Sequence, residues 1–161
     1  MTHPPGLALT SPAQAAPHPT RIATAAPLDV APLHWCRHAS PLGTLVLAAS
    51  ADGLRGVWFE GQAHFDGPAP GWRHDAAGAV PLLAAAVTQL DDWLGGRRRG
   101  FELPLDPVGT PFQRRVWQAI AAIGWGERRS YGEVAAAVGQ PQAARAIGAA
   151  TGRNPLSIVV P

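Results

Sequence analysis

The chain has 161 residues, which is enough for one sizeable hydrophobic core or two small ones. It contains no apolar run of the roughly 20 residues that cross a bilayer and no signal-peptide pattern, so we expect a cytoplasmic protein without a membrane partner. The single cysteine, Cys36, excludes an internal disulfide.

The net charge of +2 is unevenly distributed along the chain. Residues 1–108 carry seven arginines and nine acidic residues, a net charge of −2, whereas residues 109–161 carry six arginines and two acidic residues, a net charge of +4. A basic C-terminal third is a modest indication of a polyanionic partner such as nucleic acid.

The first 33 residues contain seven prolines among Ala, Thr and His. They show no apolar periodicity, which predicts a disordered, Pro/Ala-rich extension over residues 1–33. A solvated tail without a specific role is the simplest interpretation of this segment, and regular structure is expected from His34 onward.

Two strand-like runs come next. Residues 42–48 and 54–59 are mainly apolar and flank Ala51-Asp52-Gly53. Asp-Gly between apolar runs is a strong signal of a β-hairpin. Residues 61–78 are punctuated by Gly and Pro and are predicted to form a loop.

A helix is predicted from Val80 to Leu94, because apolar residues recur there at helical spacing until Gly95-Gly96 ends the pattern. The residues of this apolar stripe are Leu82, Leu83, Ala86, Val87, Leu90, Trp93 and Leu94. Together with the hairpin, the helix predicts a small α+β domain over residues 34–100.

Residues 109–161 are predicted to be mainly helical. Thr110-Pro111-Phe112-Gln113 has the pattern of a capping box with Pro at the first helical position. The helix that it opens is expected to end at Gly124. The side chains expected on its buried face are Phe112, Val116, Ile120 and Ile123.

A helix-turn-helix is predicted after this helix. Ser130-Tyr131-Gly132-Glu133 is a second capping box, and its helix is expected to stop at Gly139. Pro141 is then expected to start another helix after a turn of about three residues. Two short helices joined this tightly are typical of DNA-binding proteins.

The second helix of the pair has few side chains that could recognise bases. Arg145 is its one long cation, surrounded by Ala and Gly. Small residues let a backbone approach phosphates and a minor groove closely, and Arg145 could then enter the base stack. The alternative is that the Ala/Gly face packs on another helix while Arg145 is solvated, and the helix taken alone favours this alternative.

Several segments of the C-terminal third carry a resemblance to a known family. They are Gly109–Gln113, Ser130–Glu133, Ala143–Gly148 and Asn154–Pro161. Over about residues 38–161, and most strongly from residue 109 onward, the chain resembles the O6-alkylguanine-DNA alkyltransferases, also called methylated-DNA–protein-cysteine methyltransferases. Several motif spacings match together, which makes the resemblance specific.

The resemblance implies an α+β protein with a ribonuclease-H-like N-terminal domain and a winged-helix-like C-terminal domain over residues 109–161. It implies DNA repair by stoichiometric transfer of an alkyl group, without a cofactor, from O6 of guanine to a cysteine of the protein. O4 of alkylated thymine would be a second substrate. The implied partner is double-stranded DNA, bound through its minor groove by a monomer.

The resemblance also implies roles for four residues of the helix-turn-helix. Arg145 would fill the space left by a flipped-out guanine, which must leave the stack before its O6 substituent can be attacked. Tyr131 would press on the phosphate 3′ to the target, with its hydroxyl near the flipped base. Ala144 and Gly148 would be the further DNA-binding positions of the same helix.

Asn154 would tie this helix to the active-site segment by hydrogen bonds to backbone, and Ser157–Val160 is expected to be a strand-like run that delivers the nucleophile. The family's acceptor is the cysteine of a Cys-His-Arg motif, expected immediately after Pro161. The motif's His activates that cysteine and a later Glu orients the His, which yields a thiolate for attack on the alkyl carbon. The 161 residues include none of these three groups, so the chain as written is expected to be inactive.

Cys36 is not expected to replace the missing nucleophile, because a buried structural thiol is the commoner state of a cysteine on a strand. His34, Cys36 and His38 alternate along that strand and could offer three metal ligands on one face. Three ligands without a fourth make an incomplete site, so no metal is predicted.

Two other functions remain open at this point. An alkyltransferase-like protein that lacks the acceptor cysteine would bind DNA lesions and flag them for other repair systems. A helix-turn-helix transcription factor is the second alternative, although a recognition helix with so few polar side chains argues against it.

Overall fold

A computed structural model of the chain describes residues 32–76 and 78–160. The extension predicted over residues 1–33 therefore lies, except for Pro32 and Leu33, outside the described residues. Within them, no helix is long and apolar enough to cross a membrane.

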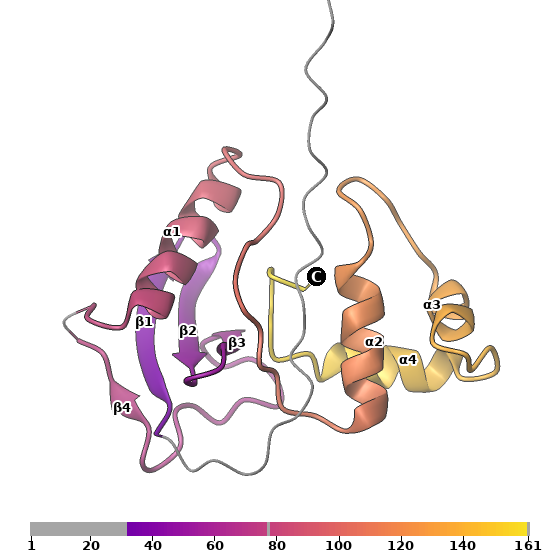
Figure 1. The fold of residues 1–161 in the computed structure, drawn as a ribbon, viewed down its shortest axis with the longest axis horizontal. Coiled ribbons are helices and arrows are strands. Elements are labelled where there is room, and N and C mark those ends of the chain that lie inside the picture. The colour runs from indigo at the N-terminus through magenta and orange to yellow at the C-terminus, as the bar shows by residue number, and fades with distance from the viewer. Residues whose placement is uncertain (1–31, 77, 161) are drawn as a thin grey trace, which may run out of the picture.

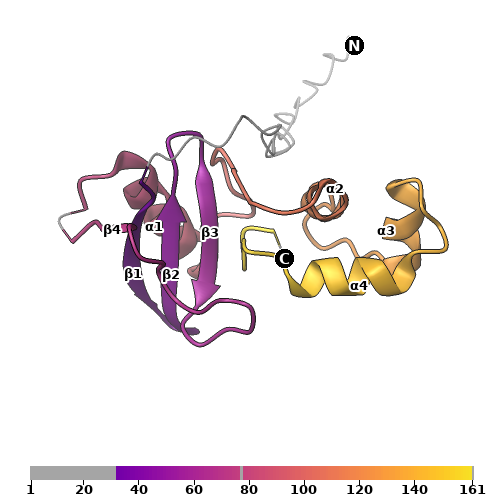
Figure 2. The ribbon, with the colours of Figure 1, turned by 90° about the horizontal axis from the view of Figure 1, so that it is seen from below.

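Strands and helices fall into two groups along the described chain. The elements are, in order, β1 (His34–Ser40), β2 (Gly43–Ala49), β3 (Leu54–Phe59), β4 (Arg73–His74), α1 (Pro81–Leu94), α2 (Pro111–Ala121), α3 (Tyr131–Ala137) and α4 (Ala144–Gly152). The sheet and α1 form one lobe, α2, α3 and α4 form the other, and the segment after α4 lies between them (Figures 1 and 2). The α+β class predicted from the sequence is confirmed.

The sheet has the strand order β3-β2-β1-β4. β1 pairs antiparallel with β2, and β2 pairs antiparallel with β3, which confirms the predicted hairpin. Gly53 is required in that hairpin because a Cβ there would lie 2.8 Å from the carbonyl oxygen of Pro104 in the linker between the lobes.

The prediction of a loop over residues 61–78 was wrong at one place. β4 lies inside it and pairs parallel with β1, where His34 faces Arg73 and Trp35 faces His74. A strand of two residues is too short to show the alternation of side chains by which strands are recognised in a sequence.

Helix α1 begins one residue after the predicted start, with Val80 as its N-cap and Pro81 in its first turn. It covers the sheet with Leu83, Ala86 and Leu90, which are all buried. Gly96 takes a left-handed conformation (φ 73°) just beyond the helix end, as glycine does at many helix C-termini.

Both predicted capping boxes are present, at Thr110 with Gln113 and at Ser130 with Glu133. α2 nevertheless ends at Ala121, earlier than the predicted Gly124, and the turn is closed by the N–H of Ile123 donating to the carbonyl oxygen of Ile120. This tighter, 3₁₀-type bond ends the regular helix before the glycine is reached.

Helix α4 begins at Ala144 and not at Pro141, which corrects the predicted start. The N–H of Ala143 donates to the carbonyl oxygen of Gln140 at 2.9 Å, so Pro141 is the second residue of a turn. The fixed φ of proline suits that turn position as well as the first position of a helix, and the sequence signal was therefore ambiguous.

The predicted strand-like run over Ser157–Val160 was also wrong. Leu156 makes one isolated parallel bridge with Val57, and the residues after it form a turn in which Ile158 has a φ of 70°. The N–H of Val160 donates back to the carbonyl oxygen of Leu156 at 2.9 Å. An apolar run shows that a segment is buried but does not separate a strand from a packed turn.

One hydrophobic core runs through both lobes. Leu45 and Leu54 from the sheet, Trp117 from α2, Ile147 from α4 and Leu156 from the last segment belong to one cluster of buried residues. The helical lobe is therefore held against the sheet by shared apolar burial as well as by the covalent linker.

Candidate nucleic-acid interface

Helices α3 and α4 form the helix-turn-helix, and both pack on α2. Val134 and Ala135 of α3 and Ile147 and Ala150 of α4 are buried. Trp117, which the sequence analysis missed on the buried face of α2, donates its indole N–H to the carbonyl oxygen of Ala150 at 2.8 Å. These contacts fix the orientation of α4 and leave its other face to solvent.

Tyr131 and Gly148 are in direct contact across the two helices. A Cβ built on Gly148 would lie 3.2 Å from Cε2 of Tyr131, so the missing side chain is what lets the ring lie against the backbone of α4. Tyr131 is still 53% exposed, which is unusual for a large aromatic side chain. The ring is thus held on one side and open to a partner on the other.

Arg145 lies three residues before Gly148 and so projects from the same face of α4. Arg145 is exposed, and within the described residues no hydrogen bond or ion pair holds its guanidinium group. Ala144, the first residue of α4, is half-buried beside it. The structure therefore brings Tyr131, Ala144, Arg145 and Gly148 together at one surface.

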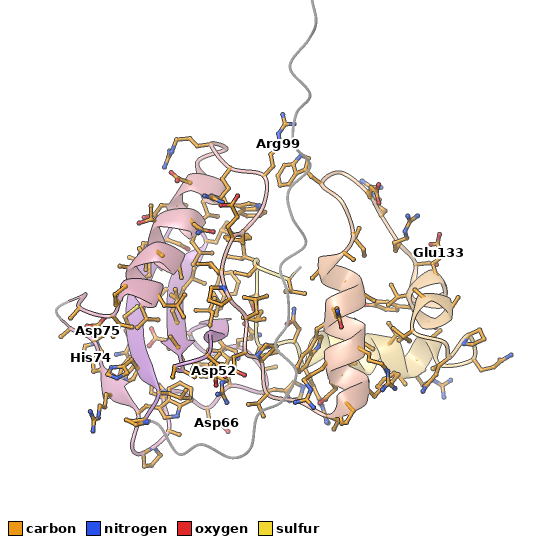
Figure 3. The ribbon with its side chains drawn as sticks, viewed as in Figure 1. Asp52, Asp66, His74, Asp75, Arg99 and Glu133 are labelled. Atoms are coloured by element: carbon orange, nitrogen blue, oxygen red, sulfur yellow. The ribbon has the colours of Figure 1, made fainter. Side chains whose placement is uncertain are left out.

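The two acidic residues of the C-terminal third, Glu127 and Glu133, share one arginine. Arg129 lies 3.6 Å from Glu127 and 4.0 Å from Glu133. The pKa of Glu133 is lowered, first by the hydrogen bond from the N–H of Ser130, then by the Ser130 hydroxyl and by Arg129. Figure 3 shows Glu133 at the N-terminal end of α3, on the outer side of the helical lobe.

Asn154 joins the end of α4 to the following turn. Its side-chain oxygen accepts a hydrogen bond from the N–H of Leu156 at 3.0 Å, and its side-chain N–H₂ donates to the carbonyl oxygen of Val160. The amide thus bridges both ends of the turn over residues 156–160. In this way one polar side chain holds Leu156 and Val160 in place relative to the end of α4.

The sheet lobe holds the same turn from the other side. The N–H of Val57 donates to the carbonyl oxygen of Pro155 at 2.7 Å, and the N–H of Ser157 donates to that of Val57 at 2.9 Å. The Ser157 hydroxyl donates to Oε1 of Gln62 at 2.9 Å. Val57 and Gln62 are positioning residues that the sequence analysis missed, since no local pattern reports a contact between residues this far apart along the chain.

A cleft of about 420 Å³ opens between the lobes beside this turn. Its walls are mainly apolar, from Trp93, Phe101, Ile120, Ile123, Trp125 and Ile158. Arg99 also borders it, at the upper end of the space between the two lobes in Figure 3. The turn that follows α4 is therefore bordered by a recess and by basic side chains.

The strand that carries His34, Cys36 and His38 does not form a metal site in the described residues, where no group of three His, Cys, Asp or Glu side chains could hold a metal ion. Nε2 of His38 instead lies 2.8 Å from Oδ1 of Asp91 on α1. Burial, and then the charge of Asp75, raise the pKa of the Cys36 thiol. This shift is opposite in direction to the lowered pKa of an activated nucleophilic cysteine.

Known proteins share both lobes of this architecture. Residues 33–107 match the family model of the ribonuclease-like domain of 6-O-methylguanine DNA methyltransferase, and residues 111–161 match its DNA-binding domain. The constitutive methylated-DNA–protein-cysteine methyltransferase of Bacillus subtilis is 41% identical over 126 residues, which is 76% of this chain and 73% of that protein. The Mycobacterium leprae methylated-DNA–protein-cysteine methyltransferase is 43% identical over 122 residues, covering 76% of this chain and 71% of that protein.

Solved structures agree with this match. The crystal structure of Mycobacterium tuberculosis OGT in complex with DNA superimposes with a TM-score of 0.71 and 41% identity, over 80% of this chain and 74% of that chain. A second crystal structure, of M. tuberculosis O6-methylguanine methyltransferase, superimposes with a TM-score of 0.69 at 39% identity. The match covers 80% of this chain and 75% of that chain. The chain belongs to the methylated-DNA–protein-cysteine methyltransferase family, with its ribonuclease-like and DNA-binding domains.

Proposed function

We propose that this chain is the DNA-reading and acceptor-positioning body of a protein that repairs DNA by moving an alkyl group from O6 of guanine to a cysteine of its own. O4 of alkylated thymine is the second substrate of the same site. The observation that carries the proposal is the surface on which an exposed Arg145 and a half-exposed Tyr131 flank the small residues Ala144 and Gly148.

This surface suits the minor groove of duplex DNA. Small side chains let the backbone of α4 approach the phosphates, and Arg145 is long enough to replace an extruded base in the stack. Tyr131 presents a rigid ring and one hydroxyl beside it, which suits contact with the phosphate and with the flipped nucleotide. The net charge of +4 on residues 109–161 supplies attraction that does not depend on sequence.

The acceptor is held by the turn after α4. The resemblance to the family implies that the acceptor cysteine follows the position of Pro161. Asn154, Val57 and Gln62 would then fix the backbone that leads to it. The thiolate sulfur bonds to the alkyl carbon while the carbon–O6 bond breaks, and the electron pair of that bond goes to the guanine, which takes up a proton. Each molecule reacts once and acts as a monomer without a cofactor.

The DNA-reading role can be tested with the 161-residue polypeptide itself. Its affinity for a short duplex containing one O6-methylguanine would be measured by fluorescence anisotropy, for the parent chain and for Arg145→Ala. Arg73→Ala is the matched control because it removes the same charge from an exposed position on the sheet lobe. We expect Arg145→Ala to weaken binding by about tenfold or more and the control by less than about twofold.

The wedge role has a more specific test in a polypeptide extended through the family's Cys-His-Arg motif and the segment that follows it. Arg145→Ala should slow repair of duplex DNA far more than reaction with free O6-benzylguanine, which needs no base flipping. Equal loss on both substrates would exclude the wedge. Strong preference for one undamaged sequence would instead favour a transcription factor.

A further inference from the structure

The turn that follows α4 contains a γ-turn centred on Ile158. The N–H of Val159 donates to the carbonyl oxygen of Ser157 at 2.8 Å, and this bond between residues two positions apart encloses Ile158 alone. Ile158 has a φ of 70°, so this is the form of γ-turn whose central residue has a positive φ. That form is rare and strained in proteins, and a β-branched residue at its centre crowds the backbone further.

Hydrogen bonds on both sides of Ile158 impose this conformation. Before it, the N–H of Ser157 donates to the carbonyl oxygen of Val57 in β3. After it, the carbonyl oxygen of Val160 accepts a hydrogen bond from the side chain of Asn154. The backbone N–H and carbonyl groups of Ile158 itself make no hydrogen bond with another described residue. Ile158 therefore gains no backbone bond in return for its strained φ, and its surroundings have to hold it there.

The side chain of Ile158 supplies a contact that offsets this strain. It is partly buried and packs against the hydrophobic core. Ile158 also lines the cleft of about 420 Å³ between the lobes, together with Phe101 of the linker and Ile120 of α2. Figure 2 shows the segment after α4, in yellow, between the sheet and α2. Apolar burial thus favours a conformation that the backbone of Ile158 disfavours.

We propose that Ile158 is a positioning residue for the acceptor segment, a role that rests on the proposed function. Its packed side chain keeps the strained γ-turn closed, and the closed turn keeps the carbonyl group of Val160 on Asn154. Val160 is then held from α4 through Asn154, from the sheet lobe through Val57, and from the cleft through Ile158. A glycine would suit the positive φ but would not fix the turn, because it has no side chain to pack.

Paired substitutions at Ile158 and Val159 test the strain in the 161-residue chain. Ile158→Gly and Ile158→Ala both remove the packed side chain, but only glycine relieves the left-handed backbone. The unfolding equilibrium constant in urea should therefore be about threefold lower for Ile158→Gly than for Ile158→Ala. Val159 is the matched control, because Ile158 and His64 are the non-glycine residues with positive φ among those described. Val159→Ala should be more stable than Val159→Gly.

The same order of stability at both positions would overturn the proposal, because Ile158 would then only fill space in the core. The opposite orders expected here cannot come from lost packing alone, since each pair of variants removes one and the same side chain.

Reaction with a free base tests the positioning in a polypeptide extended through Cys-His-Arg and the following segment. Ile158→Ala should slow reaction with O6-benzylguanine about tenfold. Ile158→Val keeps a β-branched side chain and should react at nearly the parent rate. Both variants should bind a duplex containing O6-methylguanine as tightly as the parent, because neither changes Arg145 or Tyr131.

An unchanged rate for Ile158→Ala, or an equal loss in Ile158→Val, would overturn the positioning role while the parent polypeptide still reacts. Absence of reaction in the extended parent would instead overturn the proposed function, and the positioning role with it.

Discussion

The ring of Tyr131 lies against the backbone of Gly148, where an added Cβ would sit 3.2 Å from Cε2 of the ring. The two residues belong to different helices of the helix-turn-helix. Their contact therefore couples the position of the exposed ring to the position of α4, and through it to Arg145.

Gly148→Ala should weaken DNA binding without unfolding the protein. The methyl group displaces Tyr131, so affinity for a lesion-containing duplex should fall by roughly fivefold, about 1 kcal/mol. Alanine is also about 1 kcal/mol more favourable than glycine inside a helix, and this gain in folding free energy offsets the steric cost. The urea concentration at the unfolding midpoint should therefore change little.

Gly152→Ala is the matched control for this substitution. Gly152 also lies in α4, but nothing would lie within 4 Å of its added Cβ. The Gly152→Ala variant should have the same gain in helix stability and should bind DNA as tightly as the parent chain. Equal loss of affinity in both variants would show that the contact with Tyr131 is not responsible.

Asn154→Asp and Asn154→Ala should separate the two hydrogen bonds of the Asn154 side chain. Aspartate keeps an acceptor for the N–H of Leu156 and loses the donor to the carbonyl oxygen of Val160, whereas alanine loses both. Each lost bond should cost about 1 kcal/mol locally. Amide exchange over residues 156–160 should therefore rise in the order parent, Asp, Ala, while exchange in β2 stays unchanged.

Local signals in the sequence predicted much of this fold. The two capping boxes, the Asp52-Gly53 hairpin and the apolar stripe of α1 each depend on residues within a few positions of one another. Such signals are read directly from the sequence, and the helix-turn-helix that presents Tyr131 and Arg145 follows from them.

What could not be predicted depends on contacts between distant residues. The bond from Trp117 to Ala150, the bridge from Val57 to Leu156, and the bond from Ser157 to Gln62 join segments that are far apart along the chain. Residues 157–160 were predicted as a strand-like run, but they form a turn, and no local pattern in the sequence reports the distant contacts that hold it. Functional roles for Tyr131, Ala144, Arg145, Gly148 and Asn154 stay predictions.

Acid should loosen the start of α3. Because the folded state lowers the pKa of Glu133 below its ordinary value of 4.5, the carboxylate stabilises the fold above pH 4.5, and that contribution is lost as the pH falls through the lower, folded-state pKa. Amide exchange in α3, corrected for intrinsic rates, should rise over that acidic range. Glu133→Gln keeps a capping-box side chain but cannot titrate, so its exchange should not respond to pH there.

Cys36 should not accept alkyl groups from DNA. Its pKa is raised by burial, and it lies on β1, which is separated from the helical lobe by β2 and β3 (Figure 1). Incubation of the 161-residue polypeptide with methyl-labelled DNA should therefore leave its mass unchanged. A polypeptide extended through Cys-His-Arg and the following segment should gain one methyl group per molecule, with or without Cys36→Ser. Label on Cys36 in the shorter polypeptide would contradict this prediction and would make that thiol an acceptor in its own right.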